Sequence, residues 1–271
     1  MFKFIVTLLL IATVLLTSCN SNNNEGANNN ANAIAAPTNL EYEIVKVLPH
    51  DTSAYTQGLE WDGNRIIEST GLEGKSILHI LDSNQKQIGT KVKLPPVEFG
   101  EGATLFNGKI YQLTWKTHKV YVYNAKTLAK EKELYWPYEG WGLTHNDTAL
   151  IVSTGESNIY FVDPITFAIK KTLGVYNNFG YVSNINELEF VNGKLYANIY
   201  GRNSIVVIDL NTGLISNTVD FSNLLAQAGV KYDPLTVDGG YVLNGIAYKP
   251  SSNTFFITGK CWPVLVELKI K

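Results

Sequence analysis

The sequence predicts an all-β fold, a five-bladed β-propeller with circular closure by the N-terminal strand. The first observation is a motif that recurs at the start of five short apolar strands: Gln57-Gly58-Leu59, Glu101-Gly102-Ala103, Trp141-Gly142-Leu143, Asn186-Glu187-Leu188 and Asn244-Gly245-Ile246. The second is the spacing of their first residues, which is 44, 40, 45 and 58. Units of this length with several short β runs are typical of propeller blades, whereas helical solenoids show a period of about 3.6 residues.

Residues 1–19 precede the fold and have the pattern of a secretory signal peptide. Lys3 is followed by an apolar run that is too short for a stable membrane span, and then by Leu16-Thr17-Ser18-Cys19. A cysteine after small residues resembles a bacterial lipobox, in which Cys19 carries the lipid and becomes the first residue of the mature chain. A plain cleaved signal is the alternative. The lipobox predicts a protein of the bacterial cell envelope that meets the membrane only through its lipid anchor.

Residues 20–39 are rich in Asn and Ala and hold almost no large apolar side chains, which predicts a flexible tether. The remaining residues, 40–271, are enough for one large β domain with a sizeable core. The net charge of −2 and the scattered charges give no basic stripe, so nucleic acid is not an expected partner. We expect a monomer. Cys261 is the only cysteine of this domain, which excludes an internal disulfide, and we expect it to be a small buried residue.

The chain ends are expected to meet in the last blade. Residues 41–48 alternate in polarity and would form its outermost strand, beside strands at 241–248, 254–259 and 263–269. This pairing would remove an open sheet edge. The first blade would then hold strands at 56–61, 65–70, 76–81 and 87–93.

Turn signals separate the strands within each blade. Asp62-Gly63, Asn107-Gly108 and Asn192-Gly193 lie between first and second strands, where Asn and Gly tolerate the positive φ of tight hairpins. The long last interval contains residues 221–227, which we expect to form a short helix with Asp220 or Ser222 as N-cap.

The first residues of the five motifs would face one another at one mouth of the central channel, because the innermost strands of a propeller line that channel. This ring holds one carboxylate, three amides and an indole: Glu101, Gln57, Asn186, Asn244 and Trp141. A position that served stability alone would be filled alike in each blade. The variety of residues therefore indicates a site.

A second register lies at the ends of the second strands, which are antiparallel to the first and so end at the same mouth. It places Trp115, Tyr200 and Lys260 within reach of the ring. Each has a simpler explanation: Trp115 as blade core, Tyr200 as a surface aromatic and Lys260 as a partner for Glu101. Aromatics, a carboxylate and an amine together in equivalent registers favour a site.

Seven strings in order closely resemble the plant and bacterial type of glutaminyl cyclase, and the likeness covers nearly everything after residue 41. They are Tyr55-Thr56-Gln57-Gly58-Leu59, Phe99-Gly100-Glu101-Gly102-Ala103-Thr104, Leu113-Thr114-Trp115-Lys116, Glu139-Gly140-Trp141-Gly142-Leu143, Asn186-Glu187-Leu188-Glu189, Leu243-Asn244-Gly245-Ile246-Ala247 and Thr258-Gly259-Lys260-Cys261-Trp262-Pro263. The resemblance implies a five-bladed propeller that converts the N-terminal glutamine of peptides or proteins to pyroglutamate and releases ammonia.

The resemblance also implies roles for individual residues. Glu101 would transfer protons, and Lys260 would assist catalysis. The expected substrate-binding residues are Gln57, Trp115, Trp141, Asn186, Tyr200, Asn244 and Trp262. Tyr200 departs from the family, whose best-known members have Trp after the triplet Ala197-Asn198-Ile199, and a smaller aromatic would weaken substrate affinity.

The chemistry of cyclisation agrees with these residues. The α-amine of the substrate attacks its own γ-carboxamide, so the reaction needs no Ser or Cys nucleophile and no metal-bound water. The enzyme must fold the substrate back, move a proton and stabilise an oxyanion. Glu101 suits the proton transfer. Lys260 is our choice for the oxyanion among the available donors.

Two other functions remain as alternatives. A metal-dependent propeller hydrolase would bind a divalent ion through Glu101, Asn186 and Asn244, although one carboxylate is few for catalytic calcium. A non-enzymatic propeller that binds peptides from a lipid anchor would use the same ring. We expect that catalysis requires no cofactor and no catalytic metal. The resemblance still allows a structural divalent cation, calcium, in the central channel.

Overall fold

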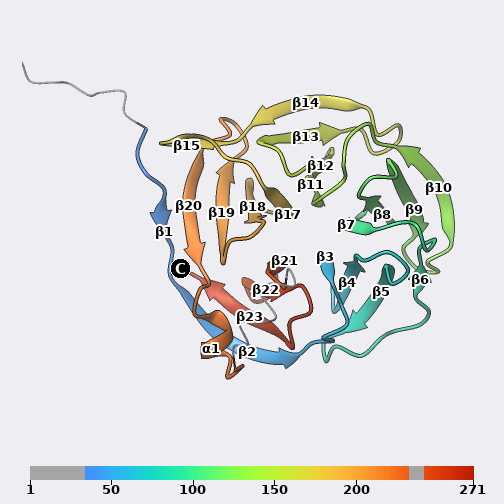
Figure 1. The fold of residues 1–271 in the computed structure, drawn as a ribbon, viewed down its shortest axis with the longest axis horizontal. Helices are drawn as coiled ribbons and strands as arrows, with labels where there is room; N and C mark the ends of the chain where they lie inside the picture. Colours follow the sequence, from blue (N-terminus) through green and yellow to red (C-terminus); the bar gives the residue numbers. More distant parts are fainter. Residues whose placement is uncertain (1–33, 232–240) are drawn as a thin grey trace, which may run out of the picture. The chain divides into compact units, whose positions relative to one another are not determined.

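The computed structural model describes residues 34–231 and 241–271. Four-stranded antiparallel sheets follow one another around a central axis (Figure 1). The first two sheets are β3 (Thr56–Asp62), β4 (Arg65–Thr70), β5 (Ile77–Asp82) and β6 (Val92–Lys93), then β7 (Gly100–Phe106), β8 (Lys109–Thr114), β9 (Lys119–Asn124) and β10 (Lys130–Tyr135). The third holds β11 (Leu143–His145), β12 (Leu150–Ser153), β13 (Asn158–Val162) and β14 (Ile169–Gly174).

The fourth sheet holds β17 (Ile185–Val191), β18 (Lys194–Ile199), β19 (Ser204–Asp209) and β20 (Ile215–Asp220), with the two-residue β1 (Thr38–Asn39) as a fifth strand at its outer edge. The last holds β21 (Leu243–Lys249), β22 (Thr254–Gly259), β23 (Val264–Ile270) and β2 (Tyr42–Pro49). The innermost strands β3, β7, β11, β17 and β21 surround the centre (Figure 1). The predicted five-bladed propeller is therefore confirmed.

The core of the protein lies between the blades. Buried apolar side chains form five clusters, and each cluster joins two neighbouring sheets. Inner strands such as β3 and β7 are buried along most of their length, whereas the outer strand β10 is largely exposed. Burial of the inner strands includes their polar residues, and Gln57 and Glu101 are each 4% exposed. The apolar clusters between the sheets also hold the blades against one another around the mouth of the channel, where the ring of motif residues lies.

The N-terminal stretch pairs with two neighbouring blades. β2 lies antiparallel to β23, from Tyr42 opposite Ile270 to Pro49 opposite Val264, which is the pairing expected from residues 41–48. Before it, β1 (Thr38–Asn39) pairs in parallel with β20. The predicted tether boundary at residue 39 is therefore wrong by two residues, because backbone pairing begins at Thr38. Residues 1–33, with the predicted signal peptide and Cys19, lie outside the described residues.

Other details differ from the sequence predictions. The fourth strand of the first blade is only β6, and a single bridge joins Leu81 to Gln87 in the predicted segment 87–93. The hairpin β15 (Tyr176–Asn177) and β16 (Gly180–Tyr181) between the third and fourth sheets was not predicted.

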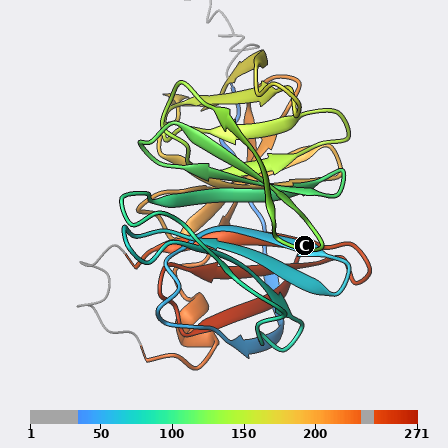
Figure 2. The same ribbon diagram turned by 90° about the vertical axis from the view of Figure 1, so that its right-hand side faces the viewer.

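The predicted helix is shorter and begins later than expected, as α1 (Leu224–Gln227), with Asn223 as an N-cap that makes no side-chain bond. Asp220 instead accepts a bond from the Ser222 N–H at 2.9 Å. α1 lies beside β2 and the last blade (Figure 2). Over the described part of the chain, we find no helix with the length and apolar character needed to cross a membrane.

Candidate active site

A cavity of about 220 Å³ opens among the residues of the predicted ring and of the second register. Its lining contains most of the predicted site, namely Gln57, Glu101, Trp115, Trp141, Asn186, Tyr200 and Lys260. Tyr55 and Phe99 complete it. Side chains from all five blades thus meet in one cavity, although they are far apart in the sequence.

Backbone pairing brings the second register to this cavity. The N–H of Trp115 donates to the Phe99 carbonyl at 3.0 Å, that of Tyr200 to the Asn184 carbonyl at 2.8 Å, and that of Lys260 to the Val242 carbonyl at 2.9 Å. Each acceptor lies two residues before a ring residue. The three side chains therefore enter at one level, as the antiparallel strand order predicts.

The aromatic residues that line the cavity, namely Tyr55, Phe99, Trp115, Trp141 and Tyr200, form its aromatic wall. Two glycines in the same register make room for this wall. A Cβ on Gly71 would lie 2.2 Å from the Phe99 ring, and a Cβ on Gly155 would lie 2.7 Å from the Trp141 ring. Gly155 also has a φ of +78°, which side-chain-bearing residues rarely adopt. The first and third blades thus contribute space where the other blades contribute side chains.

Three polar side chains form a chain of hydrogen bonds across the cavity. Lys260 Nζ donates to Gln57 Oε1 at 2.7 Å, and Gln57 Nε2 donates to Glu101 Oε1 at 3.1 Å. Asn244 Nδ2 donates to the same Gln57 oxygen at 3.1 Å and to the Thr56 carbonyl at 3.0 Å. Asn244 is fully buried and does not line the cavity. Its place in the structure therefore gives no support to the predicted substrate contact, and it orients Gln57 instead.

Burial is the main influence on the pKa values of Glu101 and Lys260, the two ionisable members of this hydrogen-bond chain. Burial raises the pKa of Glu101 well above its usual value, Lys260 opposes that rise, and the nearby Glu139 adds to it. Glu101 Oε2 is buried and has no hydrogen-bond partner. Burial lowers the pKa of Lys260 to about 8, against the opposing effect of Glu101. A carboxyl with a raised pKa beside an ammonium with a lowered pKa is typical of active sites.

Lys260 Nζ lies over two tyrosine rings, 4.6 Å from the Tyr55 centroid and 5.1 Å from that of Tyr200. The negative faces of these rings favour the protonated ammonium. Asn186 presents a further polar group to the cavity, and its buried Oδ1 has no partner. Unpaired buried oxygens on Glu101 and Asn186 indicate places where a polar ligand would bind.

Glu139 holds both indoles of the wall. Its Oε2 accepts a hydrogen bond from Trp115 Nε1 at 2.7 Å and from Trp141 Nε1 at 3.1 Å. With both N–H groups bonded to Glu139, the two rings present apolar faces to the cavity. Phe99 packs edge-on against Trp115, and Tyr200 packs edge-on against Trp141.

Sequence reasoning missed Tyr55, Phe99 and Glu139. Each stands two residues before a ring residue, so the repeat itself contains the signal. In an extended segment, residues two apart point to the same side. A second ring of residues, taken two positions before the first residue of each motif, contains all three.

The family model for glutamine cyclotransferase matches residues 10–270. The chain belongs to the glutamine cyclotransferase family. It is 35% identical over 233 residues to glutaminyl-peptide cyclotransferase of Arabidopsis thaliana, which covers 85% of this chain and 72% of that protein. Its fold is similar to the crystal structure of Myxococcus xanthus glutaminyl cyclase, with a TM-score of 0.78, 32% identity, and coverage of 87% of this chain and 98% of that chain.

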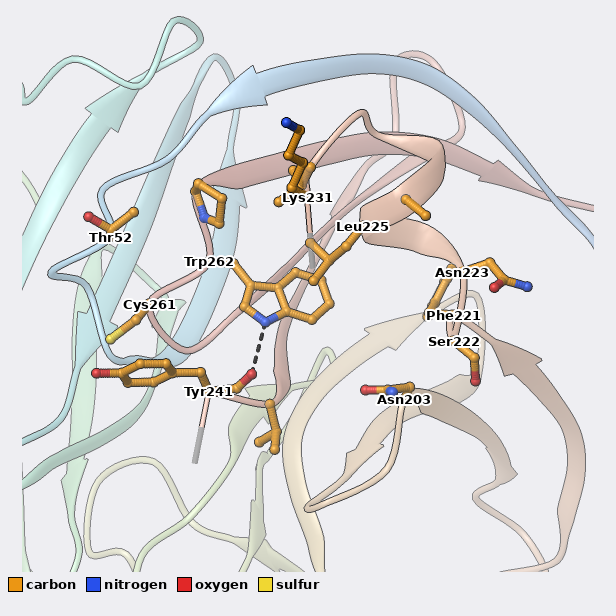
Figure 3. Close-up of a pocket in the computed structure, with 14 residues that line it drawn as sticks. Thr52, Asn203, Phe221, Ser222, Asn223, Leu225, Lys231, Tyr241, Cys261 and Trp262 are labelled. Atoms are coloured by element: carbon orange, nitrogen blue, oxygen red, sulfur yellow. Dashed lines mark hydrogen bonds between the residues drawn. The ribbon is translucent and has the colours of Figure 1, made fainter. Parts of the chain in front are cut away.

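Within this family fold, Trp262 lies away from the cavity. Its indole is buried and donates to the Tyr241 carbonyl at 3.1 Å (Figure 3). It lines a second cavity, of about 590 Å³, together with the half-buried Cys261 and residues near α1. Trp262 therefore lies outside the cavity in which its predicted substrate contact would be made. Cys261 is less buried than expected, and burial raises the pKa of its thiol, which disfavours a nucleophilic role.

The channel of this cyclotransferase fold holds further buried carboxylates beyond the ring, where a structural calcium ion would be expected. Glu187 accepts the N–H groups of Leu59 at 3.2 Å and Ile246 at 2.9 Å. Glu189 accepts the N–H of Tyr248, and Glu60 accepts bonds from the next blade. Calcium prefers six to eight oxygen ligands, and both Glu187 oxygens already accept backbone N–H groups. Over residues 34–231 and 241–271, no group of three His, Cys, Asp or Glu side chains has a metal-binding arrangement.

Proposed function

We propose that this chain is a glutaminyl-peptide cyclotransferase, which converts the N-terminal glutamine of peptides or proteins to pyroglutamate with release of ammonia. One observation carries the proposal: a buried carboxylate with a free oxygen lies beside a buried ammonium in a small aromatic cavity. Family membership and the cyclotransferase relative support the same activity.

The reaction needs little beyond shape and proton transfer. The α-nitrogen of the glutamine forms a bond to its own side-chain carbonyl carbon, and the bond from that carbon to the amide nitrogen breaks. One proton leaves the α-amine, and one proton joins the departing nitrogen to give ammonia. The aromatic wall would hold the methylene chain curled, so that the two reacting atoms meet.

Glu101 would carry the proton between the two nitrogens. As a carboxylate it takes the proton from the attacking amine through Oε2, and as an acid it gives the proton to the leaving group. A carboxyl with a raised pKa is a stronger base when it is ionised. Its bond to Gln57 fixes the side chain, so Oε2 stays directed to the substrate.

Lys260 would stabilise the negative charge that develops on the carbonyl oxygen. Its ammonium is the cation of this cavity, and its bond to Gln57 leaves other N–H groups free for the substrate. Gln57 and Asn186 would hold the substrate in register. The exposed edge of Tyr200 would meet the residue that follows the glutamine.

The activity is tested with a Gln-initiated dipeptide amide, with release of ammonia and formation of the pyroglutamyl product followed together. An Asn-initiated peptide is the matched control, since its chain is one methylene shorter. We expect release from the Gln peptide alone and no change on addition of a chelator. Binding without release would instead favour the peptide-binding propeller, and loss on chelation would favour the metal-dependent hydrolase.

We also propose that the chain acts as a lipid-anchored monomer in the bacterial cell envelope. The proposal is based on the sequence pattern of residues 1–19, with Cys19 as the lipidated residue, and on the polar segment that follows. The linker would give the propeller reach from the membrane surface to peptide N-termini.

A further inference from the structure

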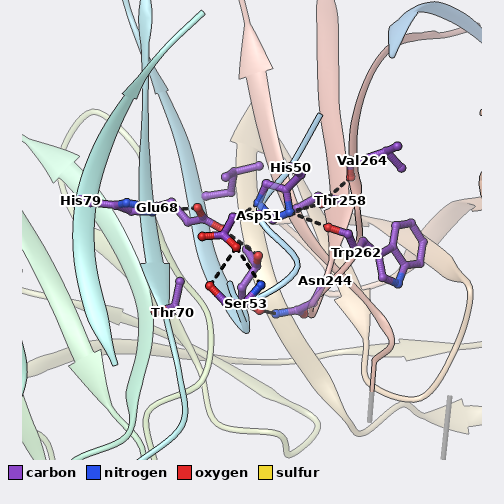
Figure 4. A network of polar contacts seen from close by, with 12 residues as sticks. His50, Asp51, Ser53, Glu68, Thr70, His79, Asn244, Thr258, Trp262 and Val264 are labelled. Atoms are coloured by element: carbon purple, nitrogen blue, oxygen red, sulfur yellow. Dashed lines mark hydrogen bonds and ion pairs between the residues drawn. The ribbon is translucent and has the colours of Figure 1, made fainter. Parts of the chain in front are cut away.

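A buried cluster outside the cavity joins the first blade to the last. Glu68 lies in β4, and its side chain is 1% exposed. Its Oε1 accepts from Thr56 Oγ1 at 2.7 Å and contacts His50 Nε2 at 3.0 Å, and its Oε2 contacts His79 Nε2 at 2.9 Å (Figure 4). The mechanism above uses none of these groups, yet a fully buried carboxylate with two histidines is costly to desolvate.

His50 faces a hydrogen-bond acceptor at each ring nitrogen. Nε2 faces the Glu68 carboxylate, and Nδ1 lies 2.9 Å from the Trp262 carbonyl oxygen. Thr258 Oγ1, 3.4 Å from Nδ1, gives its own hydrogen to the Val264 carbonyl. Both ring nitrogens must therefore donate, which makes the ring an imidazolium. Burial lowers the pKa of His50 and is the largest single effect, but the charge and hydrogen bond of Glu68, the bond to Trp262 and the charge of Asp51 together give a net upward shift.

Each member of this ion pair contacts a residue close in sequence to Lys260 or to Gln57 of the catalytic hydrogen-bond chain. The Trp262 carbonyl that His50 holds stands two residues after Lys260, and the Thr56 hydroxyl that Glu68 holds stands directly before Gln57. Lys260 and Gln57 then bond to each other in the cavity. Glu68 and His50 thus each hold a backbone segment next to one of these two catalytic side chains.

The turn that carries Lys260 requires such support. Cys261 has a φ of +57°, a left-handed conformation that side-chain-bearing residues adopt at a cost. The turn is held by the His50 bond to Trp262 and by the Cys261 N–H, which donates to Ala54 at 2.8 Å. Without the charged bond, the turn could relax and move the ammonium. A displacement of about 1 Å at a reacting centre can cost about 100-fold in rate.

We propose that the buried His50–Glu68 ion pair is a positioning pair that sets Lys260 and Gln57 in their catalytic geometry. This inference rests on the proposed cyclotransferase activity. The pair does not touch the substrate, so its effect passes through the Lys260 turn.

The test compares His50→Gln with His79→Gln in the full chain. Gln at position 50 keeps a donor but cannot bridge Glu68 and Trp262 or carry the charge, so we expect kcat to fall about 10- to 100-fold while KM changes less than about threefold. His79 contacts the same carboxylate but makes no bond to Trp262. His79→Gln should therefore keep kcat within about twofold, even where it lowers the melting temperature. Equal losses of kcat in the two variants would overturn the proposal.

A double-mutant cycle with Lys260→Met distinguishes positioning from general support of the fold. If His50 acts through Lys260, His50→Gln should add little to the loss already caused by Lys260→Met. Losses that multiply would overturn the proposal. If His50→Gln fails to fold, Thr56→Val tests the positioning of Gln57. This variant removes the hydroxyl that donates a hydrogen bond to Glu68 and keeps the side-chain volume. It should lower kcat several-fold, and an unchanged kcat would overturn the proposal.

The wild-type chain is assayed first with the Gln-initiated dipeptide amide. A wild type that releases no ammonia contradicts the proposed function itself. A wild type that is active, with variants at positions 50 and 56 that match it in kcat, contradicts only the positioning role.

Discussion

Lys260 Nζ donates a 2.7 Å hydrogen bond to Gln57 Oε1, and this bond joins the last blade to the first inside the cavity. The N-terminal strand β2 and the C-terminal strand β23 pair within the last blade, and the catalytic hydrogen bonds cross the junction between that blade and the first. Asn244, from β21, supports the same Gln57 oxygen. The stability of this junction and the geometry of the site are thereby linked.

The first prediction concerns the basic limb of the pH profile. Burial lowers the pKa of Lys260 to about 8, so the ammonium loses its proton above that pH and can no longer stabilise the oxyanion. We expect kcat/KM for the dipeptide amide to fall as pH rises from about 7 to about 10, because kcat/KM reports the ionisations of the free enzyme. Lys260→Arg keeps its charge throughout this range and should lose the basic limb, with lower activity at all pH values.

Unfolding would not explain this loss. Since the pKa of Lys260 in the folded protein is below its ordinary value of 10.5, the folded state binds fewer protons than the unfolded state between pH 8 and 10.5. The contribution of this group to stability therefore rises with pH across that window. A melting temperature that drops in parallel with kcat/KM would contradict the assignment of the basic limb to Lys260.

The second prediction separates the two effects of Glu139. Glu139→Ala removes the acceptor shared by the Trp115 and Trp141 indoles, so the wall loosens, and KM should rise about tenfold with a smaller loss of kcat. Glu139→Gln keeps an acceptor but removes the charge that raises the pKa of Glu101. It should leave KM nearly unchanged and move the acid limb of the pH profile downward. The same KM in both variants would contradict the role of Glu139 in holding the wall.

The repeat explains which parts of the site could be predicted from sequence. Equivalent registers in five blades must meet at the channel mouth, so Glu101 and Lys260 could be placed together although 159 positions separate them. Trp262 was misplaced because the left-handed φ of Cys261 turns the chain, and neighbours in sequence then face different cavities. The His50–Glu68 pair depends on contacts between blades, which no periodicity reports.

The third prediction concerns the pairing of β2 with β23. A chain that begins at His50 lacks this outer strand and exposes the edge of the last sheet. We expect aggregation or a clear loss of cooperative thermal unfolding, measured by light scattering and circular dichroism. The matched control begins at Glu41, which keeps β2 but removes β1. If the shorter chain stayed monomeric with an unchanged melting temperature, β2 would not close the propeller.

The fourth prediction tests the lipid anchor. Cys19→Ala removes the thiol that a lipobox modifies, so the variant should no longer incorporate labelled fatty acid or partition into the detergent phase. Cyclotransferase activity of the soluble propeller should be unaffected, because residues 40–271 contain the whole cavity. Unchanged detergent partitioning of Cys19→Ala would contradict the lipobox interpretation.

The last prediction addresses the proton-transfer group. Glu101→Gln keeps the size of the side chain and its capacity to bond Gln57, but it cannot accept the proton of the attacking amine. General acid and base groups contribute about 10²- to 10⁴-fold, so kcat should fall at least about 100-fold while the peptide still binds. The matched control is Glu98→Gln. Glu98 is an equally buried carboxylate that bonds Tyr121 and Lys119 outside the cavity.

Glu98→Gln should lower the melting temperature while kcat stays within about twofold of wild type, because its lost ion pair lies remote from the substrate. Peptide binding to Glu101→Gln is measured by calorimetry, and folding by circular dichroism. Near wild-type cyclisation by Glu101→Gln would show that another group moves the proton. Equal losses of kcat in the two variants would attribute the effect to buried charge in general, because a carboxylate that transfers the proton must be the one with a free oxygen in the cavity.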